Sequence, residues 1–231
     1  MALRFGRRDF GDALSSYQID GQNILMKNHT KDLGVVIDEK LKFHQHVRTI
    51  VGRAGGLMGD LLRSTVCRSP HFMLTLFVTH IRPIIEYCSS VWNVGYMGDV
   101  RSVESLQRRW TREIDGMVGV DYEERLRVLD LFSVYGRLLR KDLIRIWKAF
   151  HAEENLGVFE LFDLGVNPRV RGHSFRLRVP ICRSELRRKS FAVRCVLKWN
   201  RLPSDVVECE SYEEFKRKLD ISMGEEFFKV I

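Results

Sequence analysis

The feature that most constrains the fold is a spacing of three and four residues between apolar positions in the middle of the chain. It begins after Phe43 and recurs, with interruptions, as far as Phe150. The first run consists of Val47, Ile50, Val51, Ala54, Leu57, Met58, Leu61 and Leu62. Because an α-helix turns once in about 3.6 residues, such a run places its apolar side chains on one face. The pattern predicts a mainly α protein.

Four more stretches carry the same helical period. One starts at Pro70, a residue favoured in the first turn of a helix, and we expect it to bend near Pro83. Another covers 100–114, with Leu106 and Trp110 facing inward. The last two lie in YEERLRVLDL and SVYGRLLRKDLIRIWKAF. The second of these places four basic residues off its apolar stripe: Arg140, Lys141, Arg145 and Lys148.

The first forty residues carry the signals of β structure instead. In SYQIDGQNILM, the dipeptide Asp20-Gly21 is a strong tight-turn signal between two short runs that can pair as a hairpin. The segment LGVVI is apolar and β-branched, which predicts a third, buried strand. Short strands are therefore expected to precede the helices.

Helical spacing stops in the C-terminal third. NPRVRGHSFRLRVP alternates basic and apolar residues and contains Gly and Pro, which predicts loop or strand. The spacing returns near Glu185, places Trp199 in the core, and ends at Pro203. A last helix starts at SYEE, where Ser211 and Glu214 form a capping box. The expected regions are strands (1–42), a helical bundle (43–115), a helical pair (116–160) and a basic region of helices and loops with an acidic tail (161–231).

The positive charge of the chain is concentrated in one block. The formal net charge is +8, yet residues 169–201 alone hold eleven basic residues against one acid, Glu185. Nine of the eleven are arginines, whose planar guanidinium group suits phosphate oxygens. A solvated charged surface is the simpler alternative, and it stays open. The leading interpretation is a nucleic-acid interface formed by Arg169, Arg171, Arg176, Arg178, Arg187 and Arg188, with Phe175 able to stack on an exposed base.

The motif KDLGVVIDEKLKFHQHV raises the question of a metal or catalytic site, because it holds Asp32, Asp38, His44 and His46. The two histidines are two residues apart, so on a helix their side chains point about 200° apart. Metal ligands on one helix are spaced by three or four residues instead. The interpretation that the sequence favours is a helix start, with Asp38 near its positive end and Phe43 buried. No P-loop, GxGxxG or HExxH pattern occurs, and we expect no catalytic residues, metal or cofactor.

Cysteine usage and hydropathy indicate the compartment. Five cysteines without paired short spacing argue for a reduced, intracellular protein and against a zinc ribbon or a disulfide framework. The apolar stretch FMLTLFVTHIRPII is interrupted by His80, Arg82 and Pro83 and is shorter than the ~20 residues that a membrane span needs. MALRFGRRDFGD lacks the apolar core of a secretory signal. We expect no membrane partner.

Six motifs follow one another along the chain: KDLGVVIDEKLKFHQHV, HIRPIIEYCSSVWN, VESLQRRWTREIDG, YEERLRVLDLFSVYGRLLRKDLI, RGHSFRL, and KWNRLPSDVV followed by FKRKLD. In this order they resemble the C-terminal part of the reverse transcriptase of non-LTR retrotransposons, LINE-type elements of the jockey-like kind. The resemblance runs from about Leu3 to Asp220. Each motif alone is weak, whereas the six together are specific. One departure is Gly136, where the family tends to have a larger residue.

The resemblance implies a role for each region. Residues 1–42 would be the last strands of a polymerase palm, and residues 43–115 would be a thumb that holds the template–primer duplex. Arg48 and Arg53 would then contact that duplex. The catalytic aspartates of such enzymes lie in a Tyr-x-Asp-Asp motif, which this chain lacks. The Mg²⁺ ions of the intact parent enzyme would therefore have no site here.

We accordingly expect a truncated or degenerate copy that binds nucleic acid and is not an enzyme by itself. RNA, DNA or an RNA–DNA hybrid would be its partner, and the nucleus its location by resemblance. Whether a palm-containing partner chain exists stays open. The alternative from another class is an inert or protein-interaction helical fragment with no retained nucleic-acid binding.

Overall fold

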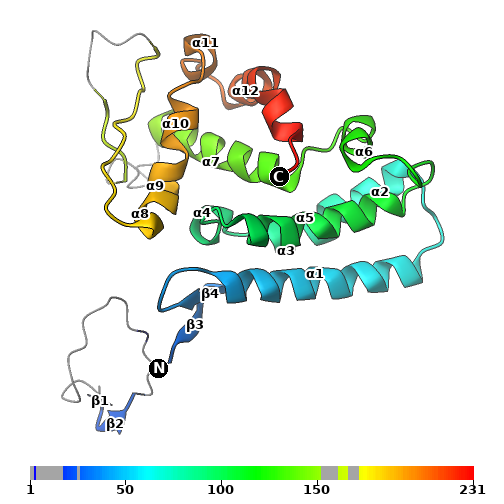
Figure 1. Ribbon diagram of the computed structural model, residues 1–231, viewed down its shortest axis with the longest axis horizontal. Coiled ribbons are helices and arrows are strands. Elements are labelled where there is room, and N and C mark those ends of the chain that lie inside the picture. The colour runs from blue at the N-terminus through cyan, green and yellow to red at the C-terminus, as the bar shows by residue number, and fades with distance from the viewer. Residues whose placement is uncertain (1–2, 4–17, 25–26, 152–160, 166–171) are drawn as a thin grey trace.

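The computed structural model describes residues 3, 18–24, 27–151, 161–165 and 172–231. These residues form a mainly helical protein with two small antiparallel hairpins at its N-terminal end, as Figure 1 shows. The prediction of a mainly α fold with N-terminal β structure is confirmed at this level.

The first hairpin is the predicted one. In it, β1 (Gln18–Ile19) pairs with β2 (Gln22–Asn23) in antiparallel register. The two turn residues, Asp20 and Gly21, have positive φ angles of 51° and 76°. Because a tight turn with two such residues matches the twist of its strands, the dipeptide closes the hairpin.

The second hairpin was only half predicted. β3 (His29–Asp32) pairs with β4 (Val35–Asp38) across a turn at Leu33 and Gly34, which have φ angles of 43° and 89°. β4 is the strand predicted in LGVVI, but Val35 is its one fully buried residue. β3 has the polar sequence HTKD, which carries no strand signal, and it is a strand because it pairs with β4.

The helix predicted after Phe43 is α1 (His44–Ser64), and its start is fixed by Asp38. The Asp38 carboxylate accepts the backbone N–H of Lys40 (2.9 Å) and of Phe43 (2.7 Å). These bonds order the backbone that leads into the helix. Four of the predicted stripe residues are fully buried: Val47, Ile50, Ala54 and Met58.

The helix predicted from Pro70 changes its winding instead of only bending. α2 (Pro70–Leu76), the π-helix η2 (Phe77–Ile81) and α3 (Arg82–Glu86) follow one another without a break. Pro83 has no N–H, and its ring crowds the carbonyl one turn earlier. The wider π turn, which ends at Ile81, accommodates that ring.

The next three helices contribute to the first of two hydrophobic clusters. They are α4 (Ser89–Trp92), α5 (Met97–Arg112) and α6 (Tyr122–Val128). Trp110 is fully buried, as predicted, and its indole N–H donates to the carbonyl of Met73 (3.1 Å). Because a buried indole needs such a partner, this bond ties α5 to α2.

α7 (Val134–His151) joins the two hydrophobic clusters. Leu138 belongs to the first cluster, whereas Leu143 and Ile146 belong to the second. The division between the clusters thus falls inside α7, within the region 116–160 that the sequence predicts as a helical pair.

The C-terminal region surrounds the second cluster with short helices. These are α8 (Glu185–Lys189), α9 (Phe191–Arg194), α10 (Val196–Trp199) and α11 (Ser204–Val207). The helical spacing predicted near Glu185 is interrupted at Ser190, where the backbone is extended (ψ 154°). Trp199 is fully buried, which confirms its predicted place in the core. The loop or strand predicted before α8 includes one isolated β-bridge, between Leu164 and Leu177.

α12 (Tyr212–Phe228) packs along α7, as Figure 1 shows. At its start, the Ser211 hydroxyl accepts the N–H of Glu214 (3.1 Å), the bond expected on the serine side of a capping box. At its end, the Phe227 carbonyl accepts the N–H of Ser133 (3.0 Å), and the Ser133 hydroxyl donates to the carbonyl of Lys229 (2.7 Å). The two ends of the C-terminal half are thereby held together.

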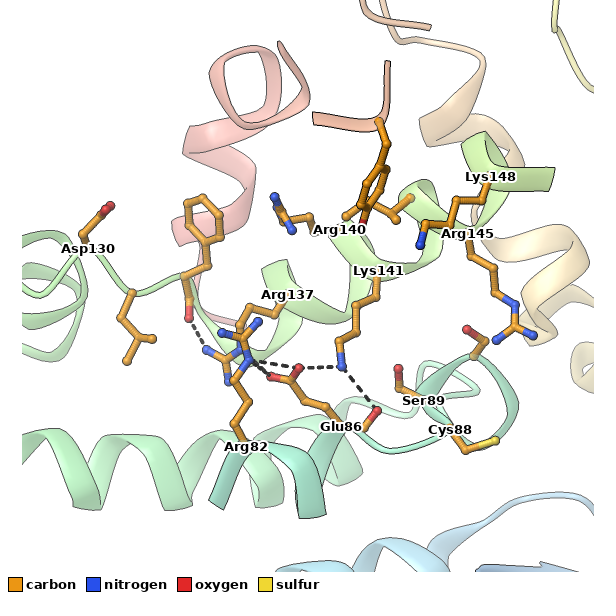
Figure 2. A pocket seen from close by; sticks show the side chains of 15 residues that line it. Arg82, Glu86, Cys88, Ser89, Asp130, Arg137, Arg140, Lys141, Arg145 and Lys148 are labelled. Atoms are coloured by element: carbon orange, nitrogen blue, oxygen red, sulfur yellow. Dashed lines mark hydrogen bonds and ion pairs between the residues drawn. The ribbon is translucent and has the colours of Figure 1, made fainter. Parts of the chain in front are cut away.

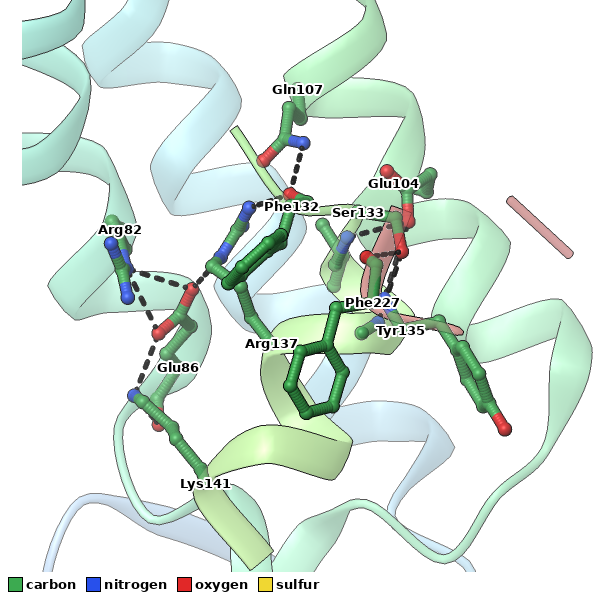
Figure 3. Close-up of polar contacts among 12 residues, drawn as sticks. Arg82, Glu86, Glu104, Gln107, Phe132, Ser133, Tyr135, Arg137, Lys141 and Phe227 are labelled. Carbon is green, nitrogen blue, oxygen red and sulfur yellow. Dashed lines mark hydrogen bonds and ion pairs between the residues drawn. The ribbon is translucent and has the colours of Figure 1, made fainter. Parts of the chain in front are cut away.

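Buried carboxylates fix α7 to its neighbours, as Figure 3 shows for Glu104 and Glu86. Glu104 of α5 accepts the first N–H of α7, from Val134 (2.8 Å), and a hydrogen bond from the Tyr122 hydroxyl. Burial raises the pKa of Glu104, although these hydrogen bonds favour its charged form. Glu86 of α3 holds the opposite side of α7 through an ion pair with Arg137.

Candidate nucleic-acid interface

The basic C-terminal region meets the start of α1 at one end of the molecule. Lys189 of α8 places its Nζ atom 3.6 Å from the centroid of the Tyr96 ring. The ring of His44, the first residue of α1, lies 4.8 Å from the same ring. The pKa of Glu185 is lowered, chiefly by the hydrogen bond and charge of Lys189 and further by Lys42. α8 therefore lies beside the segment that leads into α1.

Five of the predicted arginines are exposed: Arg48, Arg53, Arg178, Arg187 and Arg188. Across the part of the chain that the structure describes, none of the five forms an ion pair; the α8 ion pair joins Lys189 to Glu185 (3.0 Å). An unpaired guanidinium group keeps its donors for an external phosphate. Because Arg48 lies near the start of α1, it is brought to the same end of the molecule as the arginines of α8.

The other three predicted arginines are Arg169, Arg171 and Arg176. Arg169 and Arg171 are outside the described residues. Arg176 is half-buried, lies against Gly172 and has contacts within the chain. Of the six arginines proposed in the basic block, Arg178, Arg187 and Arg188 are therefore the ones that the structure places on the surface.

Phe175 lies in a loop, as predicted, but its side chain packs against the second hydrophobic cluster. It is half-buried, with its ring centroid 4.8 Å from that of His151 and 5.5 Å from that of Phe150. Its carbonyl accepts the indole N–H of Trp199 (2.8 Å). Loop residues are usually exposed, but this loop lies on the second hydrophobic cluster. The Phe175 ring therefore packs against neighbouring rings, and its predicted stacking on a base stays a prediction.

The four side chains of the N-terminal motif do not converge on one site. The Nδ1 atom of His44 lies 2.7 Å from a carboxylate oxygen of Asp99, and the Nδ1 atom of His46 lies 3.3 Å from a backbone nitrogen of β4. Burial lowers the pKa of His46. Asp38 binds the backbone before α1, and Asp32 is exposed on β3. Among the described residues, no group of three His, Cys, Asp or Glu side chains is arranged to hold a metal ion.

A basic cleft of about 720 Å³ lies between α7 and the turn from α3 to α4, as Figure 2 shows. Its lining contains six basic side chains, Arg82, Arg137, Arg140, Lys141, Arg145 and Lys148, and two acidic ones, Glu86 and Asp130. The sequence indicates that four of the six lie off the apolar stripe of their helix. It does not indicate which element faces them, so the cleft is absent from the sequence-based prediction.

Glu86 is the buried acid of this cleft, with 2% of its side chain exposed. Burial alone would raise its pKa, but the positive charges of Arg137, Arg82 and Lys141 outweigh burial and lower the pKa to about 2. Glu86 therefore stays ionised at neutral pH. Because one carboxylate is shared by three cations, the cleft keeps an excess of positive charge.

Comparison of the chain with protein families, with curated proteins and with solved structures found no match.

All five cysteines are free thiols. No helix in the described ranges combines the length and apolarity that crossing a bilayer requires.

Proposed function

We propose that this chain is a non-catalytic, nucleic-acid-binding remnant of a retrotransposon reverse transcriptase. The observation that carries the proposal is the position of Arg48, Arg187 and Arg188. These exposed arginines come from segments far apart in the sequence and lie at one end of the molecule. Phosphate contacts from such side chains supply most of the sequence-independent affinity for nucleic acids.

The family assignment within this proposal rests on the six ordered motifs. The mainly helical structure of residues 43–115 agrees with a thumb, and the hairpin of β3 and β4 agrees with the end of a palm. The sequence has no Tyr-x-Asp-Asp motif, so it lacks the paired carboxylates that bind two metal ions in phosphoryl transfer. The protein would hold RNA, DNA or their hybrid, in the nucleus if it follows its parent element, without polymerising.

The test is a binding titration with three arginines removed. Fluorescence anisotropy would compare the wild type with Arg48→Ala/Arg187→Ala/Arg188→Ala on a labelled RNA–DNA hybrid and on a labelled single strand. We expect weaker binding and a flatter dependence of log K on log salt, by about one unit of slope for each arginine that contacts a phosphate.

The matched control removes the same charge elsewhere. Arg112, Arg127 and Arg217 are exposed arginines on α5, α6 and α12, and their replacement by Ala also removes three positive charges. The proposal requires this control to keep most of the wild-type affinity. Equal losses in both triple variants would mean that net charge alone drives binding, and the end formed by α1 and α8 would not be the interface.

A further inference from the structure

The basic cleft contains more cations than its own carboxylates can neutralise. Its lining holds six basic side chains and two carboxylates, Glu86 and Asp130, and Arg140 is additionally paired with Asp220 of α12 (2.8 Å). Six cations against three carboxylates leave an excess of three positive charges. Such an excess in a concave site is unfavourable unless solvent or an anionic ligand balances it.

The cations that stay available lie on one wall of the cleft. Arg145 and Lys148 are exposed and, among the described residues, form no ion pair. Each instead lies over an aromatic ring: the Arg145 Cζ atom is 5.9 Å from the Phe191 centroid, and the Lys148 Nζ atom is 4.3 Å from the Tyr212 centroid. A ring orients a cation without cancelling its charge. Both side chains are thus held in place with their charge available.

Lys141 extends this wall towards Glu86. Its side chain is 41% exposed, and its Nζ atom contacts the Glu86 carboxylate at 2.7 Å. Lys141, Arg145 and Lys148 are spaced by four and three residues, so they follow one face of α7 over about 10 Å of helix. A row of cations of that length can contact more than one phosphate of a strand, because Lys and Arg side chains bind phosphate oxygens.

The dimensions of the cleft set the class of ligand. A volume of about 720 Å³ is within the range that encloses a small ligand, and a duplex cannot enter it. The opposite wall offers the hydroxyl of Ser89, a group that donates to phosphate oxygens (Figure 2). The aromatic rings of the lining, those of Phe132 and Tyr212, already contact other side chains. The cleft can therefore bind phosphates, but it has no free ring for a base.

We propose that the cleft between α7 and the turn from α3 to α4 binds the phosphate backbone of a single nucleic-acid strand, independently of its sequence. Lys141, Arg145 and Lys148 would contact successive phosphates, with Ser89 on the facing wall. This inference rests on the proposed nucleic-acid binding and adds to it a second site with a different preference. In this proposal the exposed arginines of α1 and α8 would hold a duplex, whereas the cleft would admit one strand.

The test uses Arg145→Gln/Lys148→Gln, because both side chains are exposed and lack ion pairs among the described residues, so the fold should survive. Circular dichroism would check that. The probes are a labelled oligothymidine strand and a labelled blunt duplex. We expect single-strand affinity to fall roughly tenfold, with a salt slope flatter by about 1.4, or 0.7 for each lost contact. Duplex affinity should stay unchanged.

A control variant, Arg127→Gln/Arg217→Gln, removes the same charge from α6 and α12 and should leave single-strand affinity unchanged. If the cleft variant binds the single strand as the wild type does, the cleft inference is wrong while the proposed function stands. If it loses duplex and single strand equally, the preference for one strand is wrong. If the wild type binds neither probe, the proposed function itself fails.

Discussion

Adding a single methyl group at Gly136 should strongly destabilise the folded protein. It lies in the first turn of α7, and a Cβ atom built there would overlap the backbone carbonyl of Phe227 and lie 2.5 Å from its Cα atom. Non-bonded carbon atoms prefer about 3.5–4.0 Å. Because the obstacle is backbone, no change of rotamer relieves the overlap. Gly136→Ala must therefore push the end of α12 away from α7.

The change in the free energy of unfolding can be estimated from the contacts that the end of α12 would lose. Phe227 is fully buried, and removing a buried Phe side chain costs about 3–5 kcal/mol. Its carbonyl also accepts the backbone N–H of Ser133 (3.0 Å), a hydrogen bond worth about 1 kcal/mol. Alanine returns about 1 kcal/mol as the better helix former. We expect Gly136→Ala to lower the free energy of unfolding by about 3 kcal/mol or more.

Urea unfolding followed by circular dichroism would measure this change. The matched control is Gly56→Ala on α1, where a Cβ atom would meet nothing within 4 Å, so the same substitution should stabilise by up to ~1 kcal/mol. Opposite signs for the two substitutions are the expected result. If Gly136→Ala is as stable as Gly56→Ala, the close approach of α12 to α7 is wrong.

Three further predictions concern the core, the buried acid and catalysis. Trp199→Ala should cost about 3–5 kcal/mol, because the side chain is fully buried and its N–H is bonded; an unchanged melting temperature would contradict this. Glu86 has a folded-state pKa of about 2, below its ordinary 4.5, so its stabilising effect is complete above pH 4.5 and is lost as the pH falls towards 2. At neutral pH, Glu86→Gln should lower the free energy of unfolding by on the order of 3 kcal/mol. This difference from the wild type should shrink as the pH falls from 4.5 towards 2, and a constant difference would refute the lowered pKa of Glu86. The purified chain should extend no primer on an RNA or DNA template with Mg²⁺. Template-dependent extension would contradict the proposal that the chain does not polymerise.

The sequence predicted those helices and turns that are determined by residues close to them in the sequence. The spacing after Phe43 predicted α1, Asp20-Gly21 predicted the first turn, and Ser211 predicted the start of α12. In each case the residues that cause the structure lie within one or two turns of it. Trp199 was also placed correctly, because helical spacing identifies the face that packs inward.

The features that escaped prediction depend on residues far apart in the sequence. β3 is a strand because β4 pairs with it, and its own polar side chains give no sign of that. Phe175 is half-buried because its loop lies against Phe150 and His151. The cleft forms because α3 brings Glu86 opposite Lys141. Helical spacing could reveal the basic side of α7, but not its neighbour.

The most direct test of nucleic-acid binding is the salt dependence of the wild-type affinity. Binding of an RNA–DNA hybrid and of a single strand would be measured over a range of salt concentrations. We predict that log K falls linearly with log salt, by roughly 0.7 per phosphate contacted on a single strand and somewhat more on a duplex. Dissociation constants no tighter than ~10⁻⁴ M for both probes at physiological salt would contradict the account. In that case the exposed arginines form a solvated surface, and the chain is an inert or protein-interaction helical fragment.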